Sequence, residues 1–215
     1  MLQTGTQMVS KDFRSATFAS NEGEGALTFY TKFANAASPS YTWQDALPNS
    51  LEFMSQGKVA MIFNYAAAIP AIQARAPFLN VGVAPIPQPK AAKRPIAYPR
   101  YVGYTVSRQS RYADLAWEFI VTLATRQDVA REYLVKTKKP PALRALVNQY
   151  LGDPDLGVFA RQALTARSWP QVDPEAIGRI LSGAIESVLA GRESPKGALG
   201  RAQDQVSLLM SRSSF

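Results

Sequence analysis

The pattern of apolar and polar positions is most informative between residues 53 and 87. Gly57 can adopt the left-handed conformation that ends a helix, so a short helix is expected to stop there. The continuous apolar run at 59–63 has the length and composition of a buried strand. Residues 81–87 predict a second buried strand, which ends at prolines because proline cannot donate a hydrogen bond to a sheet. Helix, turn and strand in this order favour an α/β protein.

Apolar residues three and four positions apart predict amphipathic helices elsewhere, each with one face toward a core. Asn49 or Ser50 is expected to cap a helix that carries Leu51 and Met54. Residues 84–99, with five prolines and little periodicity, predict a loop, as do residues 38–40. The clearest apolar faces comprise Ala26, Leu27, Tyr30 and Phe33; Ala113, Ala116, Trp117 and Ile120; and Ile177, Ile180, Leu181, Ile185 and Leu189.

The composition is that of a globular chain with enough apolar residues to bury a core, at 47% hydrophobic and 19% charged residues. No apolar run approaches the roughly 18–20 residues that cross a bilayer. The formal net charge is +8, which is compatible with nucleic acid, anionic lipid or an anionic ligand as partner. The densest basic groups, at 90–100 and 136–144, lie beside prolines, and no aromatic-interleaved basic motif accompanies them. This favours solvated loops over a nucleic-acid surface.

The residue types present argue against an enzyme. The chain has no His and no Cys, which removes the commonest general base, the usual zinc ligands and the thiol nucleophile. It also lacks a Gly-x-Ser-x-Gly elbow and a glycine-rich phosphate loop. Asp153 and Asp155, or Glu22 and Glu24, could be considered as an acid and base pair or a calcium site. The first pair, with Pro154 between its members, is better explained as a helix start. We expect no cofactor and no metal.

Several motifs, in a fixed order, resemble the maltose-binding-like family (family 1) of ABC-transporter extracellular solute-binding proteins. The first is the 53–87 stretch described above. The second is Gly-Tyr-Thr-Val-Ser at 103–107, followed by the helix-like Tyr-Ala-Asp-Leu-Ala-Trp-Glu-Phe-Ile at 112–120. A Pro-Pro turn at 140–141 comes next. The last is a final helix pair at 185–199, with Ser194 as N-cap and Pro195 at the first helical position.

The resemblance implies an incomplete α/β fold of the periplasmic-binding-protein-like (type II) kind, covering only the C-terminal half, because 215 residues are about half of what the family uses. Residues 1–100 and 150–215 would belong to the C-terminal lobe. Residues 104–142 would be a segment of the N-terminal lobe, which should expose Trp117, Phe119 and Leu123 unless a partner covers them. We therefore expect a fragment or a truncated reading frame.

The resemblance also implies ligand-binding residues. Asn64 and Tyr65 follow the strand that delivers cleft residues in the family, although a turn role for Asn64 and a packing role for Tyr65 are equally open. Three alanines follow at 66–68, where maltose-binding relatives place a stacking Trp, which argues against malto-oligosaccharide specificity. Trp43 also resembles a family position but is expected to pack beneath the cleft.

Two further pairs complete the candidate set. Tyr101 and Tyr104 flank Gly103 at an expected crossing between the lobes, where the alternative for Tyr101 is packing at the hinge. Trp169 and Gln171 precede a helix whose start reaches toward the cleft in the family, and the alternative for Trp169 is a loop residue that covers the core.

The function implied is substrate binding for an ABC importer. A sugar or similar small polar solute would bind between two lobes, and the closed form would dock on membrane permease subunits. The chain is expected to be a monomer located outside the cytoplasm, in the periplasm or at the cell surface, although its first residues lack a signal peptide and a lipobox. The alternatives are a basic helical nucleic-acid-binding or scaffold protein, and a non-functional truncated remnant of a binding protein.

Overall fold

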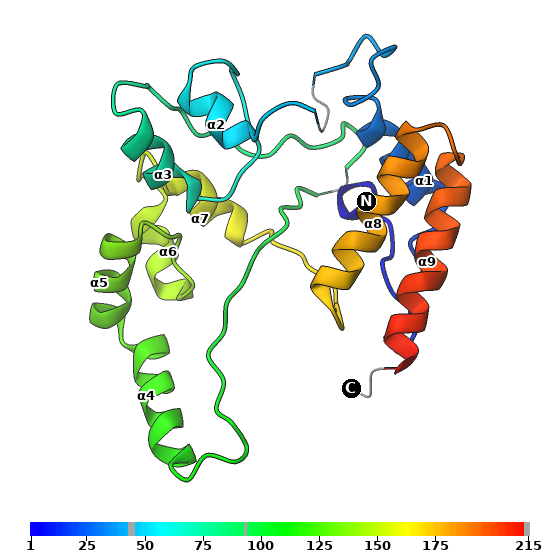
Figure 1. Cartoon of the computed structure of the whole chain (residues 1–215). Helices are drawn as coiled ribbons and strands as arrows, with labels where there is room; N and C mark the ends of the chain where they lie inside the picture. Colours follow the sequence, from blue (N-terminus) through cyan, green and yellow to red (C-terminus); the bar gives the residue numbers. More distant parts are fainter. Residues whose placement is uncertain (43–45, 93, 213–215) are drawn as a thin grey trace. The chain divides into compact units, whose positions relative to one another are not determined.

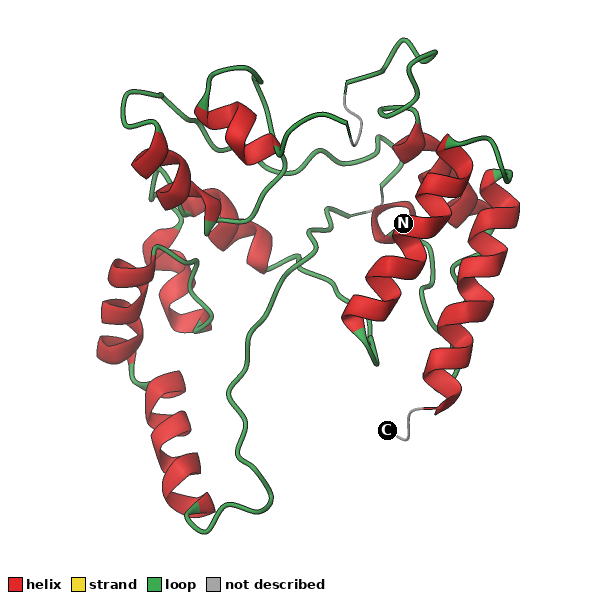
Figure 2. Ribbon diagram, viewed as in Figure 1, coloured by secondary structure: helices red, strands yellow, loops and turns green. Residues whose placement is uncertain are grey.

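The computed structural model describes residues 1–42, 46–92 and 94–212, so Trp43 lies outside the described residues. Within these ranges the regular elements are helical, and the only β pairing consists of two isolated bridges (Figures 1 and 2). The elements are the 3₁₀-helix η1 (Leu2–Thr4) and the α-helices α1 (Asn21–Thr31), α2 (Ser50–Ser55), α3 (Ala68–Arg75), α4 (Ala113–Thr125), α5 (Gln127–Thr137), α6 (Arg144–Tyr150), α7 (Gly157–Ala163), α8 (Pro174–Leu189) and α9 (Pro195–Arg212).

The chain forms two compact units. Unit 1 comprises Met1–Leu47, Gln88–Ile96 and Arg167–Phe215, and unit 2 comprises Pro48–Pro87 and Ala97–Ala166. Each unit is a group of residues whose contacts lie mostly within that group. They do not test the lobe boundaries expected at 1–100, 104–142 and 150–215, which stay a prediction.

Unit 1 has a well-filled apolar core between α1, α8 and α9. Phe18, Leu199 and Val206 are at most 1% exposed, and Ile177 is equally buried. The segment before α1 lies along α9, where the amide of Ala19 donates to Gln203 Oε1 at 2.7 Å. The predicted apolar face of α8 is confirmed, because Ile177 is buried and Ile180, Leu181 and Ile185 pack against the same core. Of the five residues predicted on this face, Leu189 at the end of the helix is the one that is exposed.

Unit 2 has a second, smaller buried region. Its helices α5, α6 and α7 pack in chain order, and α2 packs on α3. Leu146 and Ala160 are fully buried there, and Leu134 is 4% exposed. Asp153 precedes α7, and its Oδ1 accepts hydrogen bonds from the amides of Asp155 and Leu156 at 2.9 and 2.7 Å. This supports the interpretation of the acidic pair as a helix start.

Local signals for helix ends are confirmed. Asn49 caps α2 by accepting from the amide of Leu51 at 2.9 Å, and Gly57 has the expected positive φ of 68°. Ser194 caps α9 by accepting from the amide of Gly197 at 3.1 Å, and Pro195 begins that helix. The described part of the 84–99 loop forms no helix.

Two predicted helix faces are wrong in detail. In α1 the buried residues are Gly23, Leu27 and Thr31, whereas Tyr30 and Phe33 are exposed. The cause is the close contact at Gly23, which turns its side of the helix toward the core. In α4 no residue is buried, and Trp117 is 49% exposed although its spacing predicted a core position. The expected exposure of Trp117 and Phe119 is confirmed, whereas Leu123 is half-buried.

The predicted strands are also wrong as paired elements. Residues 59–63, 81–87 and 103–107 carry no strand assignment. Met61 and Phe63 are 85% and 78% exposed, so the first of these segments is not buried either. A strand is stable only when a neighbour pairs with its backbone. Among the described residues, no neighbouring strand pairs with the backbone of 59–63, 81–84 or 103–106.

Gly23 supplies a sharp test of the unit 1 core. A Cβ at this position would lie 2.0 Å from the carbonyl oxygen of Phe18 and 3.1 Å from Leu199 Cδ2. Gly23→Ala is therefore expected to destabilise the protein by about 1–3 kcal/mol through overpacking, measured by urea unfolding. Gly25→Ala in the same helix is the matched control, because a Cβ there meets nothing within 4 Å. It should be neutral or stabilise by about 0.5–1 kcal/mol. Equal effects of the two changes would contradict this packing.

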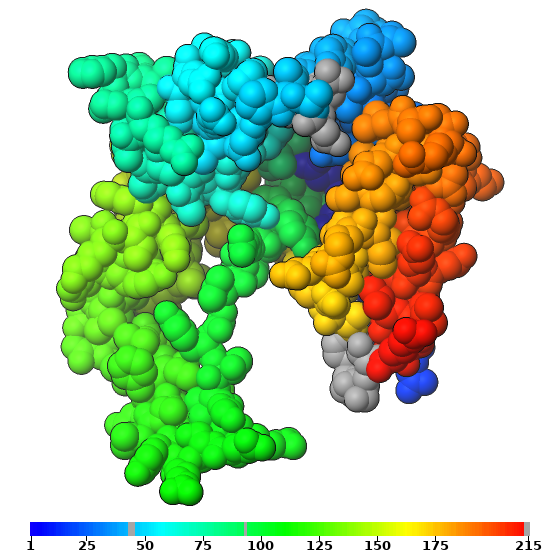
Figure 3. Space-filling view, viewed as in Figure 1, coloured from blue at the N-terminus to red at the C-terminus, as the bar shows by residue number. Residues whose placement is uncertain are grey.

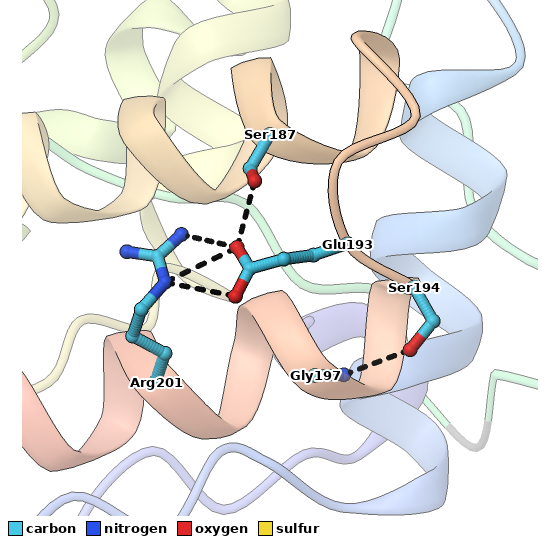
Figure 4. Close-up of polar contacts among 5 residues, drawn as sticks. All are labelled: Ser187, Glu193, Ser194, Gly197 and Arg201. Carbon is cyan, nitrogen blue, oxygen red and sulfur yellow. Dashed lines mark hydrogen bonds and ion pairs between the residues drawn. The ribbon is translucent and has the colours of Figure 1, made fainter.

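The connection between α8 and α9 is held by a charged cluster (Figure 4). The carboxylate of Glu193 accepts from Arg201 Nη2 at 2.6 Å, from Arg201 Nε at 3.1 Å and from the hydroxyl of Ser187 at 2.7 Å. The Arg201 and Ser187 hydrogen bonds lower the pKa of Glu193 from 4.5 to about 2. The Glu193 side chain keeps 30% of its exposure, so solvent weakens the ion pair.

The lowered pKa of Glu193 predicts how stability depends on pH. A carboxyl with a lower pKa in the folded state stabilises the fold fully above its ordinary pKa of 4.5, and that stabilisation is lost as the pH falls toward 2. Glu193→Gln should lower the unfolding midpoint at pH 7 and flatten its decline between these pH values, measured by thermal unfolding. Glu175→Gln is the control, because Glu175 is 90% exposed and lies 3.8 Å from Arg179. A wild-type pH profile in Glu193→Gln would contradict the assignment.

Candidate ligand-binding residues

Asn64 and Tyr65 lie between the extended segment 59–63 and α3, on the surface of unit 2. Asn64 Oδ1 accepts a hydrogen bond from the amide of Tyr65 at 2.8 Å, and the carbonyl of Tyr65 accepts from the amide of Ala68 at 2.9 Å. Asn64 thus helps to form the turn into α3, which was one of the two roles left open for it. The Tyr65 side chain is 47% exposed, so much of its ring can meet a ligand.

Tyr101 and Tyr104 lie in the extended segment that leads toward α4, also in unit 2 (Figure 1). Their side chains are 69% and 66% exposed. A Cβ at Gly103 between them would meet nothing within 4 Å, so this glycine is not required by a close contact inside the chain. The backbone of this segment is extended, and successive side chains of an extended segment point to opposite sides.

Trp169 and Gln171 lie just before α8 in unit 1. Trp169 packs against the core cluster that contains Ile177 and is half-buried. This contact matches the alternative in which Trp169 covers the core, although part of the ring remains accessible. Gln171 is half-buried as well. Asp173, two residues further on, caps α8 by accepting from the amide of Ala176 at 2.9 Å.

The candidates are divided between the two units. Asn64, Tyr65, Tyr101 and Tyr104 belong to unit 2, and Trp169 and Gln171 belong to unit 1. Their chemistry is aromatic rings with amide and hydroxyl groups, which bind polar solutes without a titrating group. Across the described ranges no group of His, Cys, Asp and Glu side chains is arranged to hold a metal ion.

An apolar hollow beside Tyr104 was not predicted from the sequence. It has a volume of about 340 Å³ and lies between residues 104–107 and α4, where Val106, Phe119 and Ile120 contribute to its walls. Two serines also line it. Both are engaged in turns, because Ser107 Oγ accepts from the amide of Gln109 and Ser110 Oγ accepts from the amide of Tyr112. The Ser-x-x-Ser spacing was the available signal.

Solved structures identify the class of fold. The chain is similar to a cyclo/maltodextrin-binding protein complexed with maltotetraose, with a TM-score of 0.76 and 22% identity over 100% of this chain and 56% of the other. A cyclic α-maltosyl-1,6-maltose-binding protein from Arthrobacter globiformis matches with a TM-score of 0.70 and 18% identity, covering 99% and 54% of the two chains. A Thermotoga lettingae ABC transporter solute-binding protein bound to α-D-tagatose gives a TM-score of 0.65 and 20% identity, covering 97% and 54%.

These likenesses define an incomplete periplasmic-binding-protein-like (type II) fold, as the sequence resemblance predicted. The chain spans a little over half the length of each of these structures. No curated protein matches the sequence closely enough to count as a relative.

The family follows from the sequence match. The family model for bacterial extracellular solute-binding proteins matches residues 2–130, which is more than half of the chain. The protein therefore belongs to the bacterial extracellular solute-binding protein family. Among the helices in the described residues, none combines the length and the apolar character that crossing a membrane requires.

Proposed function

We propose that this chain contributes to the carbohydrate-binding site of an ABC-importer substrate-binding protein. The observation that carries the proposal is the wide exposure of Tyr65, Tyr101 and Tyr104 on a chain that belongs to a solute-binding family. Two of the similar structures hold maltotetraose and α-D-tagatose, which supports a carbohydrate as the class of ligand here.

Flat aromatic rings suit this role because one face of a sugar ring is apolar, whereas its rim carries hydroxyl groups. An exposed tyrosine can cover the apolar face, and its own hydroxyl can bond to the rim. Asn64 and Gln171 would add amide groups that bind hydroxyls directly. Trp169 would supply a further aromatic ring. Solute-binding sites of this kind depend on shape and hydrogen bonding, so the proposed activity is binding and not catalysis.

In the proposed function the protein acts outside the cytoplasm, as a monomer, and delivers its solute to ABC permease subunits. Lobe closure over the solute would present the closed form to the permease. The family description supports an extracytoplasmic site of action. Because the chain spans little more than half of the similar structures, we expect weaker affinity than that of a complete two-lobed protein.

Thermal unfolding with saccharides tests the proposal. Maltotetraose, maltose and α-D-tagatose are added in large excess, with glycerol 3-phosphate as a polar solute that is not a sugar. A ligand that binds the folded chain raises the unfolding midpoint in a concentration-dependent way, and we expect this for at least one saccharide. The alternative of a non-functional remnant predicts that no solute moves the midpoint.

A pair of tyrosine variants tests the residues. Tyr101→Ala should weaken saccharide binding roughly tenfold, which corresponds to about 1.4 kcal/mol, measured by isothermal titration calorimetry. Tyr112→Ala is the matched control, because Tyr112 is 74% exposed but is not a proposed ligand contact. Neither change should alter the circular dichroism spectrum, since neither ring is buried. Equal weakening by both variants would count against a specific role for Tyr101.

A further inference from the structure

Three extended segments of unit 2 have unpaired backbones. They are residues 59–63, 81–84 and 101–106, and within the described ranges none of their amide or carbonyl groups has a hydrogen-bond partner. Extended backbone with unpaired N–H and C=O groups is a template on which other strands can pair. They overlap the strands predicted from the sequence at 59–63, 81–87 and 103–107. The residue types of these segments favour paired strands, whereas the described residues supply no strand that pairs with them.

The side chains of the same region are apolar and exposed. Met61, Phe63 and Val102 are 78–85% exposed, and Leu115 and Phe119 of α4 are 69% and 63% exposed. In the space-filling view the green atoms of the 101–112 region are widely open to the surroundings (Figure 3). Large apolar side chains exposed in this number on a folded protein mark an interaction site. The hollow between residues 104–107 and α4 offers room for further apolar side chains.

We propose that residues 59–63, 81–84, 101–106 and α4 form a strand-accepting surface. Its occupant is a polypeptide that carries the part of the solute-binding fold that this chain does not span. The similar structures extend over nearly all of this chain, which covers only 54–56% of them, so their fold holds a further stretch of comparable size. Added strands would pair with the extended segments, and their side chains would cover α4. This proposal rests on the fold and not on saccharide binding.

Two other occupants fit the surface less well. A lipid surface covers apolar side chains but cannot pair with backbone N–H and C=O groups, which a polypeptide can. A second copy of this chain brings a formal charge of +8 toward another +8, so the two copies repel each other.

The test uses the full chain without any saccharide, so that its outcome is independent of the proposed carbohydrate site. The probe is the stretch of the cyclo/maltodextrin-binding protein that this chain does not match, produced as a separate polypeptide. We expect a 1:1 complex by light scattering. Hydrogen–deuterium exchange should slow at residues 59–63, 81–84 and 101–106, because new backbone hydrogen bonds protect amides.

Proline variants distinguish strand pairing from nonspecific apolar association. Thr105→Pro removes one backbone N–H from the proposed edge, and because that N–H has no partner within the described residues, the isolated chain should keep its helicity and unfolding midpoint. Its affinity for the probe should fall at least tenfold. Arg108→Pro is the matched control, because Arg108 occupies the second position of the turn closed by Ser110 N and Ser107 O, where proline is well tolerated.

The proposal is overturned by any of three results. The first is the absence of a complex between the wild-type chain and the probe. The second is a complex that Thr105→Pro and Arg108→Pro weaken equally. The third is a homodimer that protects the same amides in the absence of the probe, which would make a second copy the occupant.

Discussion

Backbone pairing is the constraint on which the rest of this structure depends. A helix satisfies its own N–H and C=O groups, whereas an extended segment needs a neighbouring strand. Unit 1 is built from helices and from loops tied to them, so its core around Phe18, Ile177 and Leu199 is complete within the chain. Unit 2 combines helices with extended segments that find no partner among the described residues. Its helices fold together, while its strand-like sequences remain exposed.

The helical parts illustrate how local chemistry suffices when pairing is internal. Ser20, Asn49, Asp173 and Ser194 each cap the helix that follows by accepting from a backbone amide of its first turn. The Glu193 cluster then fixes how α9 follows α8. These interactions join residues that are close in sequence, and most of them can be recognised from the residue types alone.

This difference explains what the sequence could predict. Helix ends at Gly57 and Ser194 were predictable because their signals lie within a few residues. The buried strand predicted at 59–63 is not formed, because strand pairing depends on residues distant in sequence, which a local pattern does not report. The buried face of α1 depends on how closely Gly23 approaches Phe18, which no periodicity reveals. For the candidate site, the sequence identified accessible aromatic residues such as Tyr101. It also offered the packing of Trp169 over the core as one of two roles, and the structure places Trp169 against the unit 1 core.

The candidate site and the proposed strand-accepting surface share Tyr101 and Tyr104. Tyr101 and Tyr104 belong to a segment whose backbone has no hydrogen-bond partners among the described residues. Ordering such a segment costs roughly 1–2 kcal/mol per residue in backbone entropy, and a solute that ordered it alone would lose that much of its binding energy. Strand pairing would order this segment in the absence of solute, so that solute binding would no longer lose this backbone entropy. It would also hold the two tyrosine rings in place. Completion of the sheet and affinity for a solute are therefore expected to rise together.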